Sequence, residues 1–563
     1  MVKKLKRAFT ITELVIVIAV IAILAAVLIP TFTSLINKAN QSSDQSAVRN
    51  MNLALQNAEV DGELETLSEA LAILEEAGMN AKNYSTLAKN TAFVWVRSIN
   101  RVLYINTEDY SVIYPEEYKH LEYDGSEAWA TLEGSIKGED DWLTNEIGTS
   151  DLTDKQDGAK TYGVVKEGET VIAIKVDRAD RLVSAAQYLD KHKDEDIDLY
   201  LGGNIDLEGA EWNSIDRMGG NFNGNGFTIS NLRMTDTTAV SDQIQGGSAK
   251  NYTFYAFVSI FTGERFENVT IENVDINKPG IPGLDEKEGG TSYGNHTVAG
   301  AIGGIYKLGS EGNINTTISE VTVSGTIVGH SRVGGIVGFI GGITGDYMDG
   351  QVTISNCTNN ATLVSDYSVP SVAGHSTAGG IVSIVIQTDS TFKLLIDNCH
   401  NTNSVTALHA AGILARLSTN GSLLISNCSN SGMIKAEVIP GVNASGIVEK
   451  ILADTNYKDT VGTASGIFDS FQNKDYFDDT NIFTLDDNGT SVQKTVNGVL
   501  IENCSNTGSF DKQVENGGAA FTHEICVHGS TDAKPWTLRP GTLTFTNCTG
   551  KDGNQINVAT EGA

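Results

Sequence analysis

The pattern of hydrophobic and polar positions divides the chain into an apolar N-terminal part and a long part with strand-like alternation. An unbroken apolar run from Leu14 to Ile29 extends back to Phe9. As a helix, a run of this length covers the roughly 30 Å of a bilayer hydrocarbon core. We therefore predict a membrane-spanning helix at about residues 9–30, within a longer helix over residues 9–60.

The segment after this helix predicts a small α+β head at residues 61–118. The stretch LETLSEALAILEEAG has helical composition and ends at Gly78, which suits a helix C-cap. The stretches AFVWVRSINRVLYIN and YSVIYP have the composition of β-strands. Residues 119–170 are rich in Asp, Glu, Gly and Lys, and we interpret them as an acidic linker.

Short segments with period-two alternation recur from residue 171 to residue 563, and five of them contain the dipeptide Asn-Cys. No helical segment separates these repeats, so the strands cannot form βαβ units. Recurrence of this kind predicts a right-handed parallel β-helix, a solenoid in which equivalent residues stack along the axis. Each Asn is expected to bond the next turn, and each Cys to fill a small apolar site. The predicted ladder residues are Asn356, Cys357, Asn398, Cys399, Asn427, Cys428, Asn503, Cys504, Asn547 and Cys548.

The predicted fold class is therefore mostly β: a long N-terminal transmembrane helix with a small α+β head, then the parallel β-helix.

Glu13 is the one feature of the apolar run that a plain anchor does not explain, because a carboxylate within a membrane is costly. A secretory signal peptide is an alternative, but IPTFTSL after the run is a poor cleavage site. A cut between Ala8 and Phe9 gives Phe9 a new amino group, which can pair with Glu13 of a neighbouring helix.

The basic leader of residues 1–8, Phe9, Glu13 and Pro30 together resemble the N-terminus of type IV prepilins and pseudopilins. The residue before the cut is Ala8, where the family has glycine. The resemblance implies cleavage after Ala8 and N-terminal methylation at Phe9 by a prepilin peptidase. It also implies assembly with other pilin subunits through the helix, with Glu13 and Pro30 as assembly residues, and residence in the membrane before assembly.

The repeat region resembles two further groups of proteins. Gly335, Ile336, Val337 and Gly338 are similar to the GLUG repeat of bacterial surface proteins. The segment GGNIDLEGAEWNSI followed by FNGNGFTISNL is similar to the first turns of pectate-lyase-like β-helices. These resemblances imply a surface module that binds a glycan or a protein.

Composition narrows the class of partner. The chain of 563 residues carries 39 Lys and Arg against 70 Asp and Glu, a formal net charge of −31. This balance argues against nucleic acid as a partner, because its phosphates require basic side chains.

The six cysteines all follow residue 356, and because they recur within a repeat we expect free thiols rather than disulfides.

Catalytic and metal-binding patterns are weak. The stretch Gly329-His330-Ser331-Arg332 and the side chain of Arg416 offer basic groups, which we interpret as surface loop residues. We therefore predict no enzyme activity and no catalytic residues. An acidic insertion offers oxygen ligands for calcium, although a solvated loop is the preferred interpretation and we predict no cofactor. Its candidate ligands are Asp475, Asp478, Asp479, Asp486 and Asp487, and its aromatics Tyr476, Phe477 and Phe483 make it a candidate contact surface.

The sequence thus predicts a pilin-like minor or tip subunit that displays a β-helix adhesion module. The expected location is a membrane anchor before assembly, and then a pilus or the cell surface. Two alternatives stay open: a tethered β-helix polysaccharide hydrolase or lyase, and a pseudopilin of a secretion system.

Overall fold

A computed structural model of the chain separates into two compact units, Met1–Ser135 and Ile136–Ala563, and each is described by itself. The structure describes residues 36–57, 67–79, 83–107, 109–121, 129–132, 141–153, 160–207, 210–234, 244–246, 250–277, 296–305, 314–329, 331–342, 348–365, 376–386, 388–407, 409–418, 421–436, 463–465, 468–471, 480–487, 490–512, 521–523, 543–551 and 553–556.

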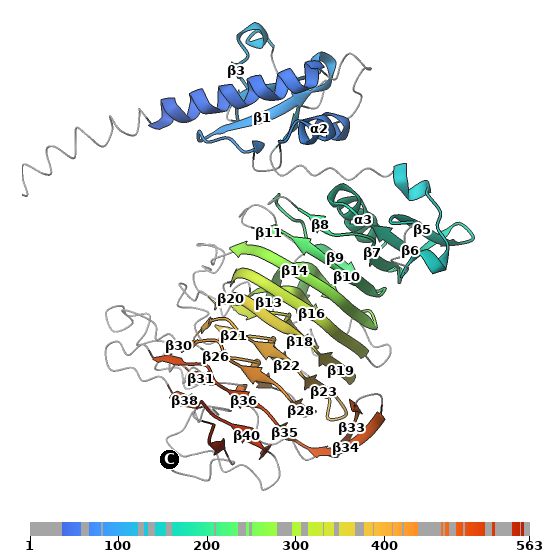
Figure 1. Cartoon of the computed structure of the whole chain (residues 1–563), viewed down its shortest axis with the longest axis vertical. Helices are drawn as coiled ribbons and strands as arrows, with labels where there is room; N and C mark the ends of the chain where they lie inside the picture. Colours follow the sequence, from blue (N-terminus) through green and yellow to red (C-terminus); the bar gives the residue numbers. More distant parts are fainter. Residues whose placement is uncertain are drawn as a thin grey trace, which may run out of the picture. The chain divides into compact units, whose positions relative to one another are not determined.

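The first unit packs helices on a small antiparallel sheet (Figure 1). Residues 36–57 form one helix, and α2 (Leu67–Glu76) follows it and ends before Gly78, whose φ of +83° suits a helix C-terminus. The four-stranded sheet has the order β3-β2-β1-β4. Its strands are β1 (Thr91–Val96), β2 (Arg101–Asn106), β3 (Val112–Tyr114) and β4 (Trp129–Thr131), and the 3-10 turns η3 (Arg97–Ile99) and η4 (Glu116–Tyr118) lie between them. The last strand comes from the segment interpreted as a linker.

Two buried polar side chains tie the helix over residues 36–57 to the rest of this unit. The carboxylate of Asp44 accepts hydrogen bonds from the backbone N–H groups of Leu87 and Ala88 at 2.9 and 3.0 Å. The amide of Asn52 both donates to the carbonyl of Val102 and accepts from its N–H, at 2.9 and 2.7 Å. Because buried polar groups are costly when unpaired, these contacts fix which face of the helix meets the sheet.

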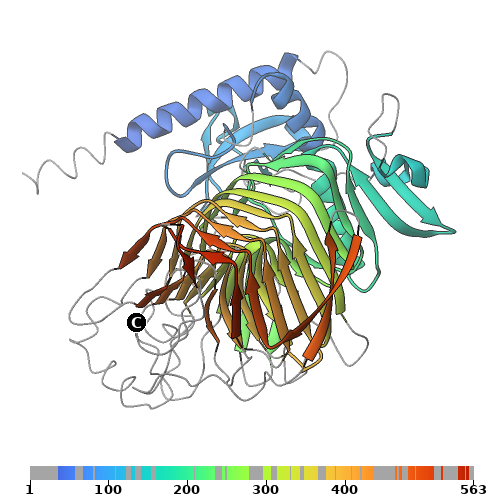
Figure 2. The same cartoon turned by 60° about the horizontal axis from the view of Figure 1, so that its bottom comes forward.

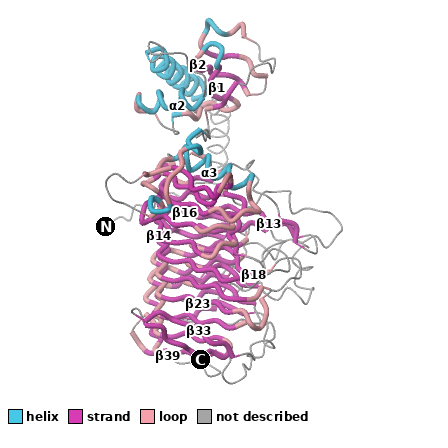
Figure 3. Tube along the Cα trace, turned by 90° about the vertical axis from the view of Figure 1, so that its right-hand side faces the viewer, coloured by secondary structure: helices cyan, strands magenta, loops and turns pink. Residues whose placement is uncertain are grey.

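The second unit is a stack of parallel turns whose strands form two sheets (Figures 1 and 3). The first sheet runs through β7 (Asp198–Leu201), β8 (Ile205–Asp206), β10 (Phe222–Ser230), β11 (Arg233–Met234), β14 (Arg265–Asn277), β16 (Ile314–Gly329), β19 (Gly350–Ser355), β20 (Thr358–Ser365), β23 (Lys393–Asp397), β24 (His400–Asn401), β25 (Val405–Ala407), β28 (Ser422–Ser426), β29 (Ser429–Asn430), β30 (Ile434–Ala436), β35 (Val499–Glu502), β36 (Ser505–Asn506), β37 (Phe510–Lys512), β39 (Leu543–Thr546) and β40 (Cys548–Thr549).

The second sheet faces the first across the core of each turn. It contains β9 (Ile215–Met218), β13 (Lys250–Phe261), β15 (His296–Ile305), β17 (Arg332–Gly334), β18 (Val337–Gly341), β21 (Thr377–Gly379), β22 (Val382–Ile386), β26 (His409–Ala411), β27 (Leu414–Ser418), β31 (Thr463–Ser465), β32 (Phe468–Phe471) and β38 (Phe521–His523), with β12 (Ile244–Gly246) antiparallel to β13. Figure 2 brings the last turns forward and shows the strands of successive turns aligned one behind another.

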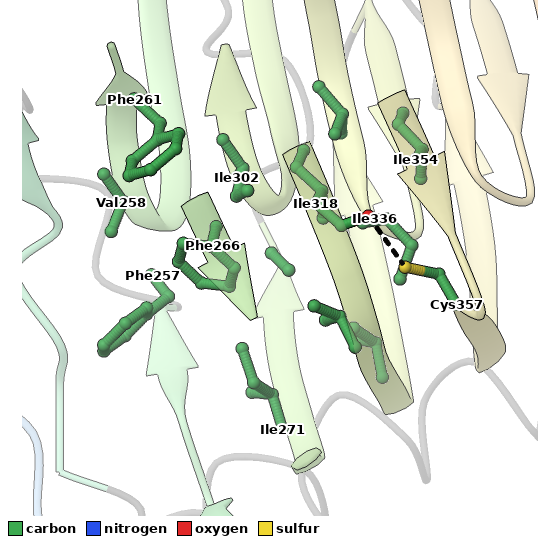
Figure 4. Close-up of a cluster of buried hydrophobic side chains, with 14 of the residues drawn as sticks. Phe257, Val258, Phe261, Phe266, Ile271, Ile302, Ile318, Ile336, Ile354 and Cys357 are labelled. Atoms are coloured by element: carbon green, nitrogen blue, oxygen red, sulfur yellow. Dashed lines mark hydrogen bonds between the residues drawn. The ribbon is translucent and has the colours of Figure 1, made fainter. Parts of the chain in front are cut away.

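Apolar side chains of both sheets meet inside the turns. Ile318 of β16, Ile354 of β19 and Ile336, in the bend between β17 and β18, are fully buried in one cluster (Figure 4). Phenylalanines fill the first turns, where Phe222 and Phe266 stack with ring centroids 4.4 Å apart. Alternation at period two places every second residue of a strand in this core, so the repeated sequence pattern becomes a continuous apolar column.

The first turn of this core is covered by a cap. The cap consists of β5 (Gly163–Glu167), β6 (Thr170–Val176), α3 (Ala179–Lys191) and the 3-10 turns η5 (Asp141–Thr144) and η6 (Thr149–Asp151). Leu182, Ala185 and Leu189 of α3 are buried in the main core cluster, and Trp142 of η5 joins them. At the other end, β41 (Gln555–Ile556) pairs antiparallel with β40.

The predicted fold class is wrong in its opening element. No helix among the described residues is long and apolar enough to cross a membrane. The first described helix, at residues 36–57, is amphipathic instead, because Asp44, Asn52 and its buried apolar residues contact the sheet. The predicted span at residues 9–30, with Ala8, Phe9, Glu13 and Pro30, lies outside the described residues. The predicted membrane-anchored localisation depended on that helix and is corrected by the same finding.

Candidate binding surface

The five predicted ladder asparagines lie at one corner of successive turns, in the left-handed backbone region. Their φ values are between 49° and 55°, and Asn268 and Glu320 occupy the same corner in the two preceding turns at 61° and 55°. Asparagine tolerates this conformation better than other residues that carry a Cβ. The asparagine therefore sets the backbone of the corner, and its side chain points to solvent rather than into the core.

Amide side chains at this corner bond to the neighbouring turn. The Nδ2 of Asn398 donates to Oδ1 of Asn356 at 2.7 Å, and Nδ2 of Asn427 donates to Oδ1 of Asp397 at 2.8 Å. Next to the corner, outward hydroxyl groups form a second column, in which Nδ1 of His400 and Oγ of Ser429 are 2.8 Å apart. The outer surface is thus ordered from turn to turn by its own hydrogen bonds.

The cysteine after each corner asparagine points inward, and all five are free and buried. The same column is occupied by Val269 and Val321 in the turns before Cys357. The Sγ of Cys357 lies 3.2 Å from the carbonyl oxygen of Ser355. It lies 3.9 Å from that of Ile318, and Figure 4 shows this second contact. Burial raises the pKa of the Cys357 and Cys428 thiols well above the usual value. The column is therefore a buried filling of the core, in the place that valines take in the preceding turns.

A second asparagine ladder lies fully inside the core. Nδ2 of Asn359 donates to Oδ1 of Asn401, Asn401 to Asn430, and Asn430 to Asn506, each at 2.7 Å. Each of the first three also donates to the carbonyl two residues further along, at 2.8–3.1 Å. The sequence carries the signal as Asn-Cys-x-Asn, but our prediction singled out only the first asparagine of this motif. In the last turn Gly550 takes the place of the second asparagine.

The glycine-rich bends of the second sheet lie against this inner ladder. A Cβ at Gly335 would lie 2.6 Å from Cγ of Asn359, and one at Gly380 would lie 2.7 Å from Cβ of Asn401. Within the GLUG-like stretch, a Cβ at Gly338 would lie 2.4 Å from Cγ1 of Val298. These glycines are thus required for close packing, and the stretch that resembles GLUG has a structural role here.

The basic side chains that we interpreted as surface loop residues lie elsewhere. Arg332 begins β17 and is 2% exposed, with its guanidinium carbon 5.3 Å from the ring centroid of Phe339. Arg416 lies in β27 and is also buried. The sequence interpretation was wrong because an outward strand position of a parallel sheet and a loop position carry similar residue types. His330 lies outside the described residues.

The acidic insertion is divided between described and undescribed positions. Asp475, Asp478 and Asp479, with Tyr476 and Phe477, lie outside the described residues, whereas Asp486 and Asp487 end strand β33 (Thr480–Asp487). This strand pairs with β34 (Thr490–Asn497) in a hairpin. Phe483 and Val496 of the hairpin pack on Leu395, Leu424 and Leu500 of the first sheet, so Phe483 is not an exposed contact residue. Within the described part of the chain, no group of three or more His, Cys, Asp or Glu side chains is arranged to hold a metal ion.

An ordered polar surface follows the asparagine corner along the second unit. We define the polar strip as the corner column, Asn268, Glu320, Asn356, Asn398, Asn427, Asn503 and Asn547, and the adjacent column, Thr270, Thr322, Thr358, His400, Ser429, Ser505 and Thr549. The register aligns both columns over seven successive turns, a length of roughly 29 Å at about 4.8 Å per turn. All residues of the adjacent column are half-buried, and the corner residues are half-buried or exposed. The strip contains no lysine, arginine or large apolar side chain.

The chain was compared with protein-family models, curated proteins and solved structures, and no match was found in any of the three comparisons.

Proposed function

We propose that the protein is a minor, pilin-like filament subunit whose solenoid is a non-catalytic binding module. The observation that carries the proposal is the polar strip, an ordered and repeated surface of amide and hydroxyl groups. The structure of the first unit supports the pilin-like part, because a helix held by buried polar contacts against a four-stranded antiparallel sheet suits a small pilin head. The resemblance of residues 1–30 to prepilins is the second support.

Binding and catalysis are separated by one experiment on the full chain. The purified protein is incubated with insoluble and soluble polysaccharides and with whole bacterial and animal cells. The bound fraction is measured by sedimentation, and the supernatant is assayed for new reducing ends and for unsaturated sugar products. We expect binding without product release. Product release would favour the hydrolase or lyase alternative, and absence of binding to every target would reject the binding module.

The filament part of the proposal is tested at Glu13. Cells that assemble type IV filaments are sheared, and the amount of the protein in the filament fraction is measured by immunoblot. If Glu13 pairs with the amino group of Phe9 in a neighbour, Glu13→Leu should be depleted from filaments. Thr12→Leu, an equally apolar change one residue away, is the matched control. Equal incorporation of the two variants and the parent protein would remove the support for the pairing.

A further inference from the structure

We propose that the polar strip binds a linear, uncharged polysaccharide that lies parallel to the solenoid axis. This inference rests on the proposed binding function and specifies the ligand of the same surface. It is carried by three properties of the strip: its charge, its hydrogen-bonding groups and its repeat.

The charge of the strip disfavours polyanions. Its one carboxylate is Glu320, and the residues beside the corner include the carboxylates of Glu267, Asp397 and Glu502. Of these, Glu502 is paired with Lys494 of the hairpin. Like charges repel at the distances of a bound polymer, and the whole chain carries −31. Acidic glycans, nucleic acids and anionic lipid surfaces are therefore poor ligands for this surface.

The chemical groups of the strip favour a glycan over a protein. Amides and hydroxyls both donate and accept hydrogen bonds, as sugar hydroxyls do. Protein interfaces depend on buried aromatic and large apolar anchors at their centre, and the strip has none. A contact made only of short neutral polar side chains suits a partner that is itself covered with hydroxyl groups.

The repeat favours an extended polymer. Equivalent groups recur about every 4.8 Å along the axis, so a chain of repeated sugar units meets the same donors and acceptors at turn after turn. The groups are also held in place before binding, as the 2.7 Å bond from Asn398 to Asn356 and the 2.8 Å contact of His400 with Ser429 illustrate. Side chains already ordered in the free protein lose less entropy when they bind.

The hairpin of β33 and β34 packs on part of the outer face of the first sheet, beside the polar strip. The neighbouring column lies two residues before Glu267, Ser319 and their equivalents. Its residues are Arg265, Thr317 and Thr353 in the turns before the hairpin, but Leu395, Leu424 and Leu500 beneath the hairpin. The polar strip keeps its small polar residues through the same turns. The neighbouring column thus becomes apolar where the hairpin covers it, whereas the polar strip stays polar in the same turns.

The test compares two double variants of the full chain that differ by four residues along the same turns. Thr322→Arg with Ser429→Arg places two long cations in the polar strip. Thr326→Arg with Met433→Arg places them on the same two turns, at outward and exposed positions outside the strip. Circular dichroism and thermal unfolding establish that both variants are folded. The probes are crystalline cellulose and chitin as uncharged linear polymers, and polygalacturonate coupled to beads as an acidic one.

We expect the parent protein to bind cellulose or chitin and not polygalacturonate, with a bound fraction that is unchanged when salt rises from about 0.05 to 0.5 M. The strip variant should bind at least about tenfold more weakly, and the control variant within about twofold of the parent. Loss in both variants, loss in neither, preference for polygalacturonate, or no binding to either uncharged polymer would overturn the inference. The parent protein could bind whole cells but no uncharged polymer, and the strip variant could lose that binding. In that case the proposed ligand class is wrong, and the proposal of a binding module is still supported. If nothing is bound at all, both proposals fail.

Discussion

At the scale of the residue, the Asn-Cys dipeptide joins two unrelated physical requirements. The asparagine has a positive φ, at which a β-branched side chain is strained, and the cysteine behind it fills a column that valine fills elsewhere. The side chains point to opposite sides of the same corner. A dipeptide that looked like a single ladder unit is therefore a turn residue followed by a core residue.

The conformational role of the asparagine predicts a specific order of stability. Asn427→Val should destabilise the second unit by about 1–2 kcal/mol, the cost of forcing a residue with a branched Cβ into the left-handed region. Asn427→Gly should cost less, because glycine adopts positive φ without a steric penalty. The free energy of unfolding is measured by urea titration.

Ser431→Thr is the matched control for these variants, since Ser431 is exposed on the same turn and is not among the residues with positive φ, and threonine adds a branched Cβ while keeping the hydroxyl that donates to the carbonyl of Asn401. It should change stability by no more than about 0.5 kcal/mol. If Asn427→Gly were as damaging as Asn427→Val, the side-chain bond to Asp397 would matter more than the backbone conformation.

At the scale of the element, each turn is held to the next by the inner asparagine ladder as well as by its strand pairings. The ladder is buried, so each amide depends on its neighbours for its hydrogen bonds. The glycine bends of the second sheet leave the space that the amides occupy. Ladder and bend are therefore one packing unit, although they are far apart in each repeat.

This dependence predicts a large effect at Asn401. Asn401→Ala removes the acceptor of Asn359 Nδ2 and the donors to Asn430 Oδ1 and the Asn403 carbonyl. Each buried group left unsatisfied costs about 1–3 kcal/mol, so we expect a total loss above about 3 kcal/mol in urea unfolding. Thr402→Ala removes a hydroxyl of an exposed residue on the same turn, which donates to the Asn359 carbonyl and to Asn360 Oδ1, and it should cost far less because water can replace these bonds. Equal losses in the two variants would show that the ladder is replaceable by water or by rearrangement.

A glycine of the GLUG-like stretch is predicted to tolerate no side chain. Gly338→Ala places a methyl group 2.4 Å from Val298 Cγ1 and 2.9 Å from the carbonyl oxygen of Gly303, so the strands must separate. We expect a loss of about 1–3 kcal/mol, as for other overpacked cores. Gly148→Ala is the control, because its nearest neighbours would be 3.5 Å away, and its thermal midpoint should stay close to that of the parent. A Gly338→Ala variant with the parent's midpoint would contradict the packing argument.

At the scale of the whole molecule, the parallel stacking of turns could be read from the sequence, whereas several of its details could not. Repeats without intervening helices leave few arrangements other than stacked parallel turns. The inner ladder was not predicted because the sequence does not distinguish the two asparagines of Asn-Cys-x-Asn. Only the positive φ of the first asparagine shows that its side chain points outward and that the second one points into the core. The Arg332 side chain was wrongly predicted to be exposed, because period-two alternation does not distinguish an outward face that is covered from one that is exposed to solvent. The hairpin was read as a solvated loop because its acidic residues hide the apolar face that carries Phe483.

The continuous core predicts that the five column thiols behave as a group. In a Cys526→Ala background, the five Asn-Cys thiols should not react with a maleimide under native conditions, since all are at most 1% exposed. With rising urea they should become reactive in one transition, because stacked repeats unfold cooperatively with their neighbours. Mass spectrometry of the labelled peptides gives the midpoint for each cysteine. A thiol that reacts in the native state, while the other four stay protected, would show that its turn does not belong to the common core.

The inner ladder also bears on how a protein of this kind changes its length in evolution. Cys399 and Cys428 occupy the same place in adjacent turns, and the segments around them read Asn-Cys-His-Asn and Asn-Cys-Ser-Asn. Duplication or deletion of the stretch between them replaces the inner asparagine of one turn by the equivalent asparagine of another turn, so each flanking turn still meets an amide partner. Gene rearrangement can therefore lengthen or shorten the solenoid by whole turns, in steps of about 4.8 Å. The packing of the core side chains does not have to change.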